Sequence, residues 1–426
     1  MDTKILIAVV IFVTVYGFLI WDKFDRAIIS VLGAGGLLFL GIITQEEAVE
    51  GIDFNTLGLL VGMMAIVSIC QKTGMFQYLA IKSAKFARGE PMLILIYLSI
   101  VTAVLSAMLD NVTTVLLIAP ITLLITDALK VTPYPFLFSQ ILASNIGGAA
   151  TLIGDPPNIM IGSSQKFTFM DFIVNVAPIM PLILLVTLLI LRLVYKEELT
   201  ASEELKAKIM EFREEEAIED PVLLKKSLLI LSLVIVGFLL HGVFPVEPAT
   251  TALTGAAVLM LISGEDIHDI MGRVEWSTIF FFLGLFVLVH GLVEVGLISM
   301  IAEEILSFTG GDIATTAYLT LWFSGVLSAF VDNIPFVATM IPLIEHMETY
   351  MGGKEMVMPV WWALSIGACL GGNGSLIGAS ANVIIAGFAA RSGYPIGFLR
   401  FMKVGLPLTL LSLLISHIYI YFRYLS

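Results

Sequence analysis

Long apolar runs alternate with short polar segments along nearly the whole chain, and most runs have the length that a helix needs to cross a bilayer. In the first part of the chain, this pattern predicts spanning helices near 4–21, 27–43, 55–71 and 171–195. In the second part, it predicts them near 227–243, 249–263, 276–291 and 402–423. We therefore expect an all-α polytopic membrane protein, with the lipid bilayer as its partner.

Two further apolar stretches each contain an Asp-Asn pair. Residues 105–120 read LSAMLDNVTTVLLIAP and residues 327–342 read LSAFVDNIPFVATMIP, so Asp110-Asn111 aligns with Asp332-Asn333. A carboxylate in hydrocarbon costs about 2.5–3.5 kcal/mol on insertion scales. Two carboxylates at the same place in two copies therefore indicate a functional site.

The chain is a repeat of one unit. An offset of 222 residues also aligns Gly33 with Gly255, and an offset of 224 aligns NIGGAATLIGDPPN (145–158) with CLGGNGSLIGASAN (369–382). Each of these two strings interrupts an apolar helix with glycines. We predict a first repeat at residues 1–196, a charged cytoplasmic linker at 197–221 and a second repeat at 222–426. Internal repeats of this kind are typical of secondary transporters.

The loop charges predict how the repeats lie in the membrane. Residues 72–88 carry Lys72, Lys82, Lys85 and Arg88, which places them in the cytoplasm. Segments 44–54 and 292–314 each carry four acids and no Lys or Arg, and suit the outside. These placements agree only if each Asp-Asn segment enters the membrane and returns to the same face. A plain twelve-span arrangement violates the charge rule. We therefore expect two inverted repeats, each with five transmembrane helices plus a re-entrant hairpin and a broken helix, in a multi-pass cell-membrane protein with both termini outside.

Four places in the chain interrupt the helical pattern at membrane depth, where only protein or a watery cavity can satisfy the backbone. They are the two Asp-Asn tips and the segments 147–158 and 371–382. We expect 110–114 to contact 147–158, and 332–336 to contact 371–382, near the midplane. The neutral oxygens there come from Asn111, Thr113, Thr114, Thr151, Asn158, Ser375 and Asn382. Such oxygens suit a hard cation such as Na⁺, or a small polar solute.

Some of these residues have simpler interpretations. Asp110 and Asp332 are also favoured helix N-caps. Asp155, which precedes Pro156-Pro157, is also a candidate turn acid, and the second repeat has Ala379 in its place. In addition, His290 and Glu294 lie one helical turn apart and form either an interfacial pair or a proton relay.

Composition narrows the function. Of the 426 residues, 58% are hydrophobic and 13% are charged, against about 25% charged in soluble domains. Residues 196–220 hold ten acids and four bases and so contribute −6 to the net charge of −13, which gives no reason to expect a nucleic-acid partner. Cys70 and Cys369 have no metal-ligand spacing, and no nucleophile–base pattern indicates an enzyme. We expect no cofactor other than a coupling ion, Na⁺ or H⁺.

The motifs resemble those of the ion transporter superfamily, which groups arsenite pumps, NhaD-type sodium/proton antiporters, the melanosomal P protein and sodium-coupled di- and tricarboxylate carriers. LDNVTT (109–114) and NIGGAATLIGDPPN (145–158) look most like the P protein and its prokaryotic relatives, and the tips DNVTT and DNIPF also look like NhaD-type antiporters. The carboxylate carriers have Ser-Asn-Thr at the tips, where this chain has Asp.

The resemblance implies a homodimer that moves by an elevator mechanism, with one sodium clamp per half and the substrate between the clamps. The positions that match the family are Asp110, Asn111, Gly148, Thr151 and Asn158, and Asp332, Asn333, Gly372, Ser375 and Asn382. The clamps imply Na⁺ at Asn111, Thr151 and Asn158, and at Asn333, Ser375 and Asn382.

We expect a secondary active transporter that exchanges a cation, Na⁺, for protons, because two buried carboxylates are surrounded by neutral oxygens. Proton-coupled efflux of arsenite or antimonite is one alternative, although Cys369 alone cannot form a three-sulfur site. Sodium-coupled transport of citrate or a dicarboxylate is another, although the tip carboxylates would repel such an anion.

Overall fold

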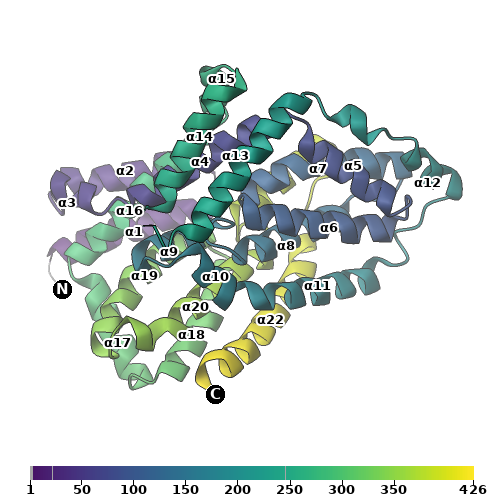
Figure 1. Ribbon diagram of the computed structural model, residues 1–426. Helices are drawn as coiled ribbons and strands as arrows, with labels where there is room; N and C mark the ends of the chain where they lie inside the picture. Colours follow the sequence, from purple (N-terminus) through teal and green to yellow (C-terminus); the bar gives the residue numbers. More distant parts are fainter. Residues whose placement is uncertain (1–2, 22, 245) are drawn as a thin grey trace.

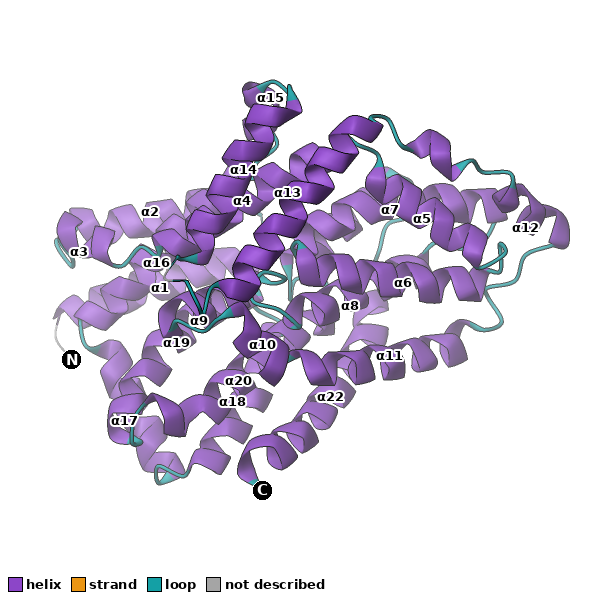
Figure 2. Ribbon diagram, viewed as in Figure 1, coloured by secondary structure: helices purple, strands orange, loops and turns teal. Residues whose placement is uncertain are grey.

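The computed structural model describes residues 3–21, 23–244 and 246–426, and every regular element in these ranges is a helix (Figures 1 and 2). The prediction of an all-α membrane protein is confirmed: among the described residues, eight helices are long and apolar enough to cross a membrane. In hydrocarbon a helix satisfies its own backbone hydrogen bonds, which explains why this apolar sequence folds into helices alone.

The two halves have the same order of elements. The first half contains α1 (Thr3–Trp21), α2 (Arg26–Phe39), α3 (Gln45–Glu50), α4 (Phe54–Gln71), α5 (Met75–Phe86), α6 (Pro91–Met108), α7 (Asn111–Leu129), α8 (Tyr134–Ala149), α9 (Pro156–Gln165), α10 (Phe169–Asn175) and α11 (Met180–Tyr195). The second contains α13 (Pro221–Leu240), α14 (Pro248–Ser263), α15 (Ile267–Gly272), α16 (Trp276–Glu294), α17 (Leu297–Thr309), α18 (Ile313–Ser328), α19 (Asn333–Tyr350), α20 (Lys354–Gly371), α21 (Ser380–Arg391) and α22 (Phe398–Ile420). Between them lies α12 (Glu203–Met210).

The halves interlock through reciprocal contacts. Helix α2 packs on α16 and α4 packs on α14, and we call α1, α2, α4, α13, α14 and α16 the frame. Helix α6 packs on α8 and α18 packs on α20, and we call α6–α9 and α18–α21 the core. Within the core, α7 contacts α21 of the other half, and α19 contacts α9. Such matched pairs are what two similarly folded halves produce when they face each other; the inverted arrangement in the membrane, and the division at 197–221, stay predictions.

Two predicted helices differ from the observed ones. The span predicted at 171–195 is divided into α10 and α11, because Pro178 and Pro181 interrupt the helical hydrogen bonds. The span predicted to begin at residue 227 begins at Pro221, with Asp220 as its N-cap. The added turn contains the charged Lys226. The helix accommodates this charge because the Lys226 Nζ donates a hydrogen bond to the Ile262 carbonyl at 2.6 Å.

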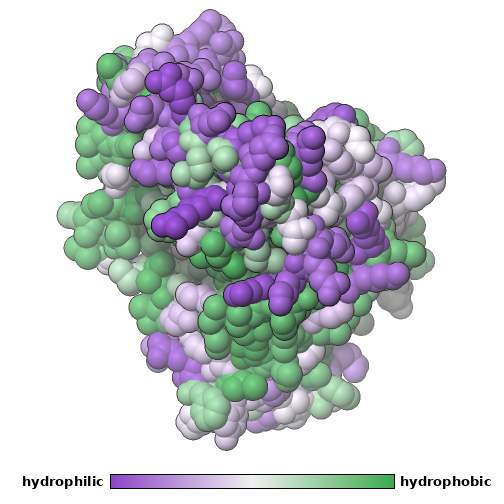
Figure 3. Space-filling model, turned by 90° about the vertical axis from the view of Figure 1, so that its right-hand side faces the viewer, coloured by the Kyte–Doolittle hydropathy of each residue, from purple (hydrophilic) through white to green (hydrophobic). Residues whose placement is uncertain are grey.

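The charged linker and the acidic segments lie at opposite ends of the molecule. Helix α12 lies at the right of Figure 1, whereas α3 and α17 lie at the left. Figure 3 views the right-hand end directly and shows polar residues over its upper and middle parts, with hydrophobic residues below them. This separation agrees with the loop charges used to predict the topology, although the side on which each end lies stays a prediction.

Candidate functional site

Both broken helices are closed by backbone contacts that only small residues permit. Residues 150–155 separate α8 from α9, and residues 372–379 separate α20 from α21. A Cβ added to Gly148 would lie 2.4 Å from the Gly154 carbonyl oxygen, which is too close for any side chain. A Cβ on Gly372 would lie 3.2 Å from the matching Gly378 oxygen. The two predicted site glycines therefore permit the close contact between the two backbone segments of each break.

Each Asp-Asn tip contacts the break in its own half, as predicted. The backbone N–H of Asn111 donates to the Gly154 carbonyl at 3.1 Å, and that of Asn333 donates to the Gly378 carbonyl at 3.2 Å. Thr151 Oγ1 donates to the Ala107 carbonyl at 2.6 Å, and Ser375 Oγ makes the matching bond in the other half. The contact prediction is confirmed for both halves.

The tip carboxylates do cap their helices. Asp110 Oδ1 accepts a hydrogen bond from the Thr113 N–H at 2.7 Å, and Asp332 Oδ1 accepts one from the Ile334 N–H at 3.0 Å. Both carboxylates are nevertheless buried, with exposed fractions of 6% and 8%. Because a cap uses one oxygen of each carboxylate, capping and ligand binding are compatible here.

Asp155 is the point at which the two halves meet. Its side chain has no exposed surface. One oxygen accepts a hydrogen bond from Asn111 Nδ2 at 3.1 Å, and both oxygens lie 3.3 Å from Asn333 Nδ2. Although Asp155 occupies the N-cap position of α9, its side chain makes no capping bond. The carboxylate therefore faces the two tip asparagines, and the turn-acid interpretation does not explain its position.

A chain of asparagines continues from Asp155 across the centre. Asn111 Nδ2 also donates to Asn145 Oδ1 at 3.1 Å. Asn145 Nδ2 in turn donates to Asn373 Oδ1 and to Asn382 Oδ1, both at 3.0 Å. Asn145 lies on α8 and the other two lie in or beside the second break, so this network joins the two broken helices directly.

Asn158 and Asn382 hold the breaks in shape. The Asn158 amide donates to the carbonyls of Ala149 and Thr151, at 3.0 and 2.9 Å. Its Oδ1 accepts from Ser365 Oγ at 2.7 Å. Asn382 donates in the same way to the carbonyls of its own break. Their amide groups are thus used within the protein, and sodium binding at the predicted clamps stays a prediction.

A small cavity lies between the two tips and is lined by acidic, amide, hydroxyl and apolar side chains. Its volume is about 30 Å³, the share of one water molecule in the liquid. The polar residues that line it are Asp110, Asn111, Asp155, Glu275, Thr278, Asn333 and Ser380. Asn111 is 3% exposed, and its Oδ1 has no hydrogen-bond partner among the described residues. A buried oxygen without a donor, beside carboxylates, favours a small cation or a protonated ligand.

The predicted threonines differ in their position. Thr114 is fully buried, and its Oγ1 has no hydrogen-bond partner among the described residues. Thr113 is partly buried and serves the tip mainly through its backbone N–H. Neither lines the small cavity, so their hydroxyl groups are not brought to it.

The second tip carries a counter-ion that the sequence pattern did not reveal. Arg26, the first residue of α2, places Nη1 2.5 Å from Asp332 Oδ2 and 3.2 Å from Ser380 Oγ. From the sequence alone, Arg26 looks like an ordinary positively charged loop residue. At the 222 offset the other half has Pro248, so the repeat gives no signal for Arg26.

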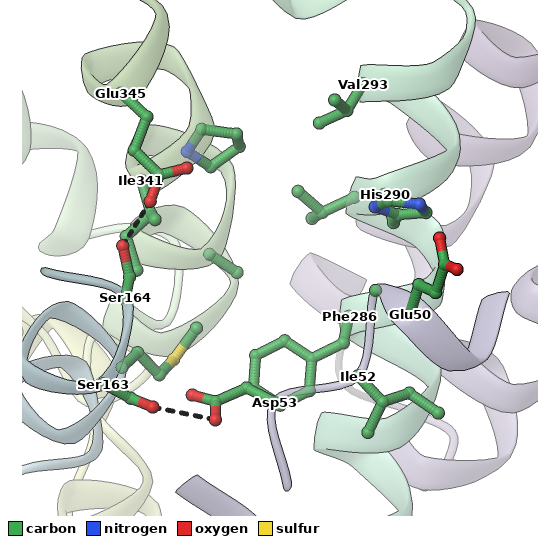
Figure 4. Close-up of a pocket in the computed structure, with 15 residues that line it drawn as sticks. Glu50, Ile52, Asp53, Ser163, Ser164, Phe286, His290, Val293, Ile341 and Glu345 are labelled. Atoms are coloured by element: carbon green, nitrogen blue, oxygen red, sulfur yellow. Dashed lines mark hydrogen bonds between the residues drawn. The ribbon is translucent and has the colours of Figure 1, made fainter. Parts of the chain in front are cut away.

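A larger polar cavity of about 370 Å³ lies between the frame and the core (Figure 4). Asp53 approaches it from the start of α4, and its Oδ1 accepts a hydrogen bond from Ser163 Oγ of α9 at 2.8 Å. On the core side, Ser164 Oγ donates to Glu345 Oε1 at 2.5 Å. His290 lines the opposite wall, with its Nε2 3.4 Å from Glu294 Oε1. The lining residues come from the end of α3, the segment between α3 and α4, and helices α9, α16 and α19.

Comparison with known proteins gives matches along nearly the whole chain. The sequence model of the family described as "Citrate transporter" matches residues 16–367. An uncharacterized transporter of Mycobacterium bovis is 42% identical over 422 residues, which cover 98% of each chain. A 46 kDa membrane protein of Mycobacterium leprae is 40% identical over 423 residues, which cover 98% of this chain and 99% of that protein.

The human P protein is 34% identical over an alignment of 503 residues, which covers 98% of this chain and 60% of the P protein. Among solved structures, the YdaH transporter of Alcanivorax borkumensis has a similar fold, with a TM-score of 0.57 at 13% identity. The similarity covers 95% of this chain and 97% of YdaH. At this identity the structure supports the fold alone.

Proposed function

Because the chain belongs to the citrate transporter family and is a membrane transporter, we propose that it exchanges Na⁺ for protons at the small cavity between its tips. The observation that carries this proposal is the concentration of carboxyl groups at that cavity. Asp110, Asp155 and Glu275 line it, together with Asn111, whose Oδ1 has no hydrogen-bond partner among the described residues. An anionic substrate would be repelled by these carboxylates, whereas a small cation would gain oxygen ligands.

The exchange follows from competition for the same oxygens. A carboxylate that binds Na⁺ cannot hold a proton on the oxygen that coordinates the metal, and a protonated carboxylate presents less negative charge to Na⁺. Asp110 and Asp155 are buried, so leaving both charged without a cation is unfavourable. The site therefore holds either a cation or protons, and this condition couples the two fluxes.

Access to the site fits the same proposal. The 370 Å³ cavity lies between the N-cap of α4 and helix α16 on the frame side and helices α9 and α19 on the core side. A core that moves against the frame would open the tips to one side of the membrane at a time, as alternating access requires. The contact between Asp53 and Ser163 lies on this boundary and would have to break in each cycle.

Citrate transport is the second candidate, because the family carries that description. Arg26 is the basic group near the tips, and it is paired with Asp332. Arsenite efflux is less well supported, because Cys369 is buried and places its Sγ 3.5 Å from Asn158 Oδ1, while the other cysteine, Cys70, lies on a frame helix.

The test is a flux measurement in liposomes that enclose a pH dye. Na⁺, Li⁺, arsenite and citrate are added in turn to vesicles that contain the parent protein, and a protonophore control defines the full signal. We expect Na⁺ to move the dye signal in the parent and not in Asp155→Asn. Asp312→Asn is the matched control, since Asp312 caps α18 through the Thr315 N–H but lies at the surface, and it should transport normally. A signal with citrate and none with Na⁺ would overturn the proposal.

A further inference from the structure

The ion pair between Arg26 and Asp332 joins the frame to the core. Arg26 begins frame helix α2, whereas Asp332 lies at the second tip and Ser380 begins core helix α21. The guanidinium approaches Asp332 Oδ2 at 2.5 Å, and Ser380 Oγ donates to the same oxygen at 3.0 Å. The Arg26 and Asp332 side chains are 19% and 7% exposed. The second tip carboxylate is thus already neutralised by a cation that the chain supplies.

In the described part of the chain, no equivalent cation pairs with the first tip. The position that corresponds to Arg26 is Pro248, and the position that corresponds to Ser380 is Pro156. Proline has no cationic group and no side-chain donor, so neither residue can neutralise Asp110. Asp110 forms no ion pair among the described residues and lines the small cavity instead. Where one half has a guanidinium, the other has space for a ligand.

The charge on Arg26 is permanent. The guanidinium group does not lose its proton in proteins, so it cannot serve as the exchanged proton. It also cannot leave the protein, since it is tied to α2. Arg26 therefore holds a permanent positive charge, covalently attached to the chain, in the place where a bound cation would lie beside the carboxylate.

We propose that Arg26 is a tethered counter-ion that fills the cation position of the second half, which leaves one exchangeable cation site per chain, at Asp110 and Asp155. The count of exchangeable sites rests on the proposed cation transport. The counter-ion role itself rests only on the pairing of Arg26 with Asp332.

The site is reachable for a small replacement cation. Arg26 lines a cavity of about 220 Å³ together with Asp25, Ser277 and Ser380. Removal of the side chain in Arg26→Ala would leave Asp332 and Ser380 facing this cavity. Free guanidinium ion matches the lost group in charge and shape, and Na⁺ matches it in charge alone.

The experiment measures ligand binding and thermal stability of the full chain in detergent, without transport. We expect the parent to bind one Na⁺ per chain and Arg26→Ala to bind two. Free guanidinium should displace the second Na⁺ and raise the Tm of Arg26→Ala, and leave the Tm of the parent unchanged. Arg26→Ala/Asp332→Asn removes both charges and should bind one Na⁺ again. Arg213→Ala, in the exposed linker, is the control and should behave like the parent.

Several results would overturn the proposal. They are two Na⁺ in the parent, one Na⁺ in Arg26→Ala, or a Tm of Arg26→Ala that does not respond to guanidinium. If Arg26→Ala does not fold, refolding in the presence of guanidinium supports the counter-ion role, and failure to refold with it contradicts that role. A parent that binds no Na⁺ contradicts the proposed function, while the guanidinium response still decides the role of Arg26.

Discussion

The two Asp-Asn tips have nearly the same sequence and the same backbone contacts, yet their electrostatic surroundings are opposite. Asp332 is paired with Arg26, whereas Asp110 faces a small cavity and forms no ion pair in the described part of the chain. Asp155 adds a carboxylate to the first break, where the second has Ala379. The comparison shows how two halves with matching backbone contacts can differ in the charges that surround them.

Replacing Asp155 should have the largest effect on transport. In Asp155→Asn the tips keep a polar neighbour of the same size but lose the shared negative charge. We expect sodium-driven proton flux to fall on the order of 100-fold or more, since loss of a buried charge partner costs about 3–5 kcal/mol. Flux in liposomes measures this, and an unchanged Tm shows that the protein still folds. Flux like that of the parent would show that the Asp155 charge is not needed for the exchange.

Asp332→Asn should affect stability more than its counterpart Asp110→Asn. The first change removes the buried carboxylate that pairs with the partly buried Arg26 guanidinium, and we expect it to lower the free energy of unfolding by about 3–5 kcal/mol. Asp110→Asn keeps the cap and removes no ion pair, so its stability should change little while its transport is lost. Thermal unfolding of both variants makes the comparison. Equal loss of stability would mean that the two tips are not electrostatically different.

Asn145→Ala tests whether the halves are held together at the centre. The substitution removes the bonds to Asn373 and Asn382 and leaves the Asn111 amide short of an acceptor. We expect a loss of about 1–3 kcal/mol from the buried polar groups left unpaired. The matched residue at the 224 offset is Cys369, whose contact with Asn158 is longer, so Cys369→Ala should cost less. Chemical unfolding of the two variants in detergent gives the difference, and a larger loss for Cys369→Ala would contradict it.

Lys72 gives the smallest expected effect. Lys72 lies just beyond the end of α4, and its ammonium group donates a hydrogen bond to the Glu265 carboxylate, which raises the pKa of Lys72. The pair therefore stabilises the fold fully below the ordinary lysine pKa, and this contribution is lost as the pH rises through the raised value. At neutral pH, Lys72→Met should cost only about 0–1 kcal/mol, because the pair is partly solvated. In the second half Glu294 replaces the lysine. Glu294→Gln keeps the Lys72–Glu265 pair and should lose stability at alkaline pH like the parent, whereas Lys72→Met should lack that loss. Unfolding measured from neutral to alkaline pH separates the two variants.

Much of the fold could be predicted from the sequence, because the bilayer allows few structures and apolar runs of helical length form helices in it. The tips and breaks could also be predicted, since Asp110 and Gly148 stand out in apolar surroundings and recur at fixed offsets. Asp155 could be located in this way, but its contacts with both tips could not, because they depend on how the halves face each other.

Arg26 and Asn145 could not be assigned from the sequence. Arg26 lies 306 residues from Asp332, and no local pattern in the sequence records that pairing. Asn145 stands inside an apolar helix where a polar residue has many explanations, and its counterpart Cys369 does not mark it as part of a repeated site. Residues that make the halves different carry no repeat signal, so the features that distinguish one tip from the other are the ones a repeat-based prediction misses.

The asparagines at the centre have a kinetic consequence. A chain built from two similar halves has room for two parallel routes, each working at its own rate. Asn145 bonds directly to Asn373 and Asn382, so the broken helices of the two halves are tied where each would have to move. Under the proposed function, neither half can complete its conformational change while the other half stays in place. Each chain then works as one carrier with one turnover time. The measured transport rate therefore reflects one transport cycle per chain, and not one per half.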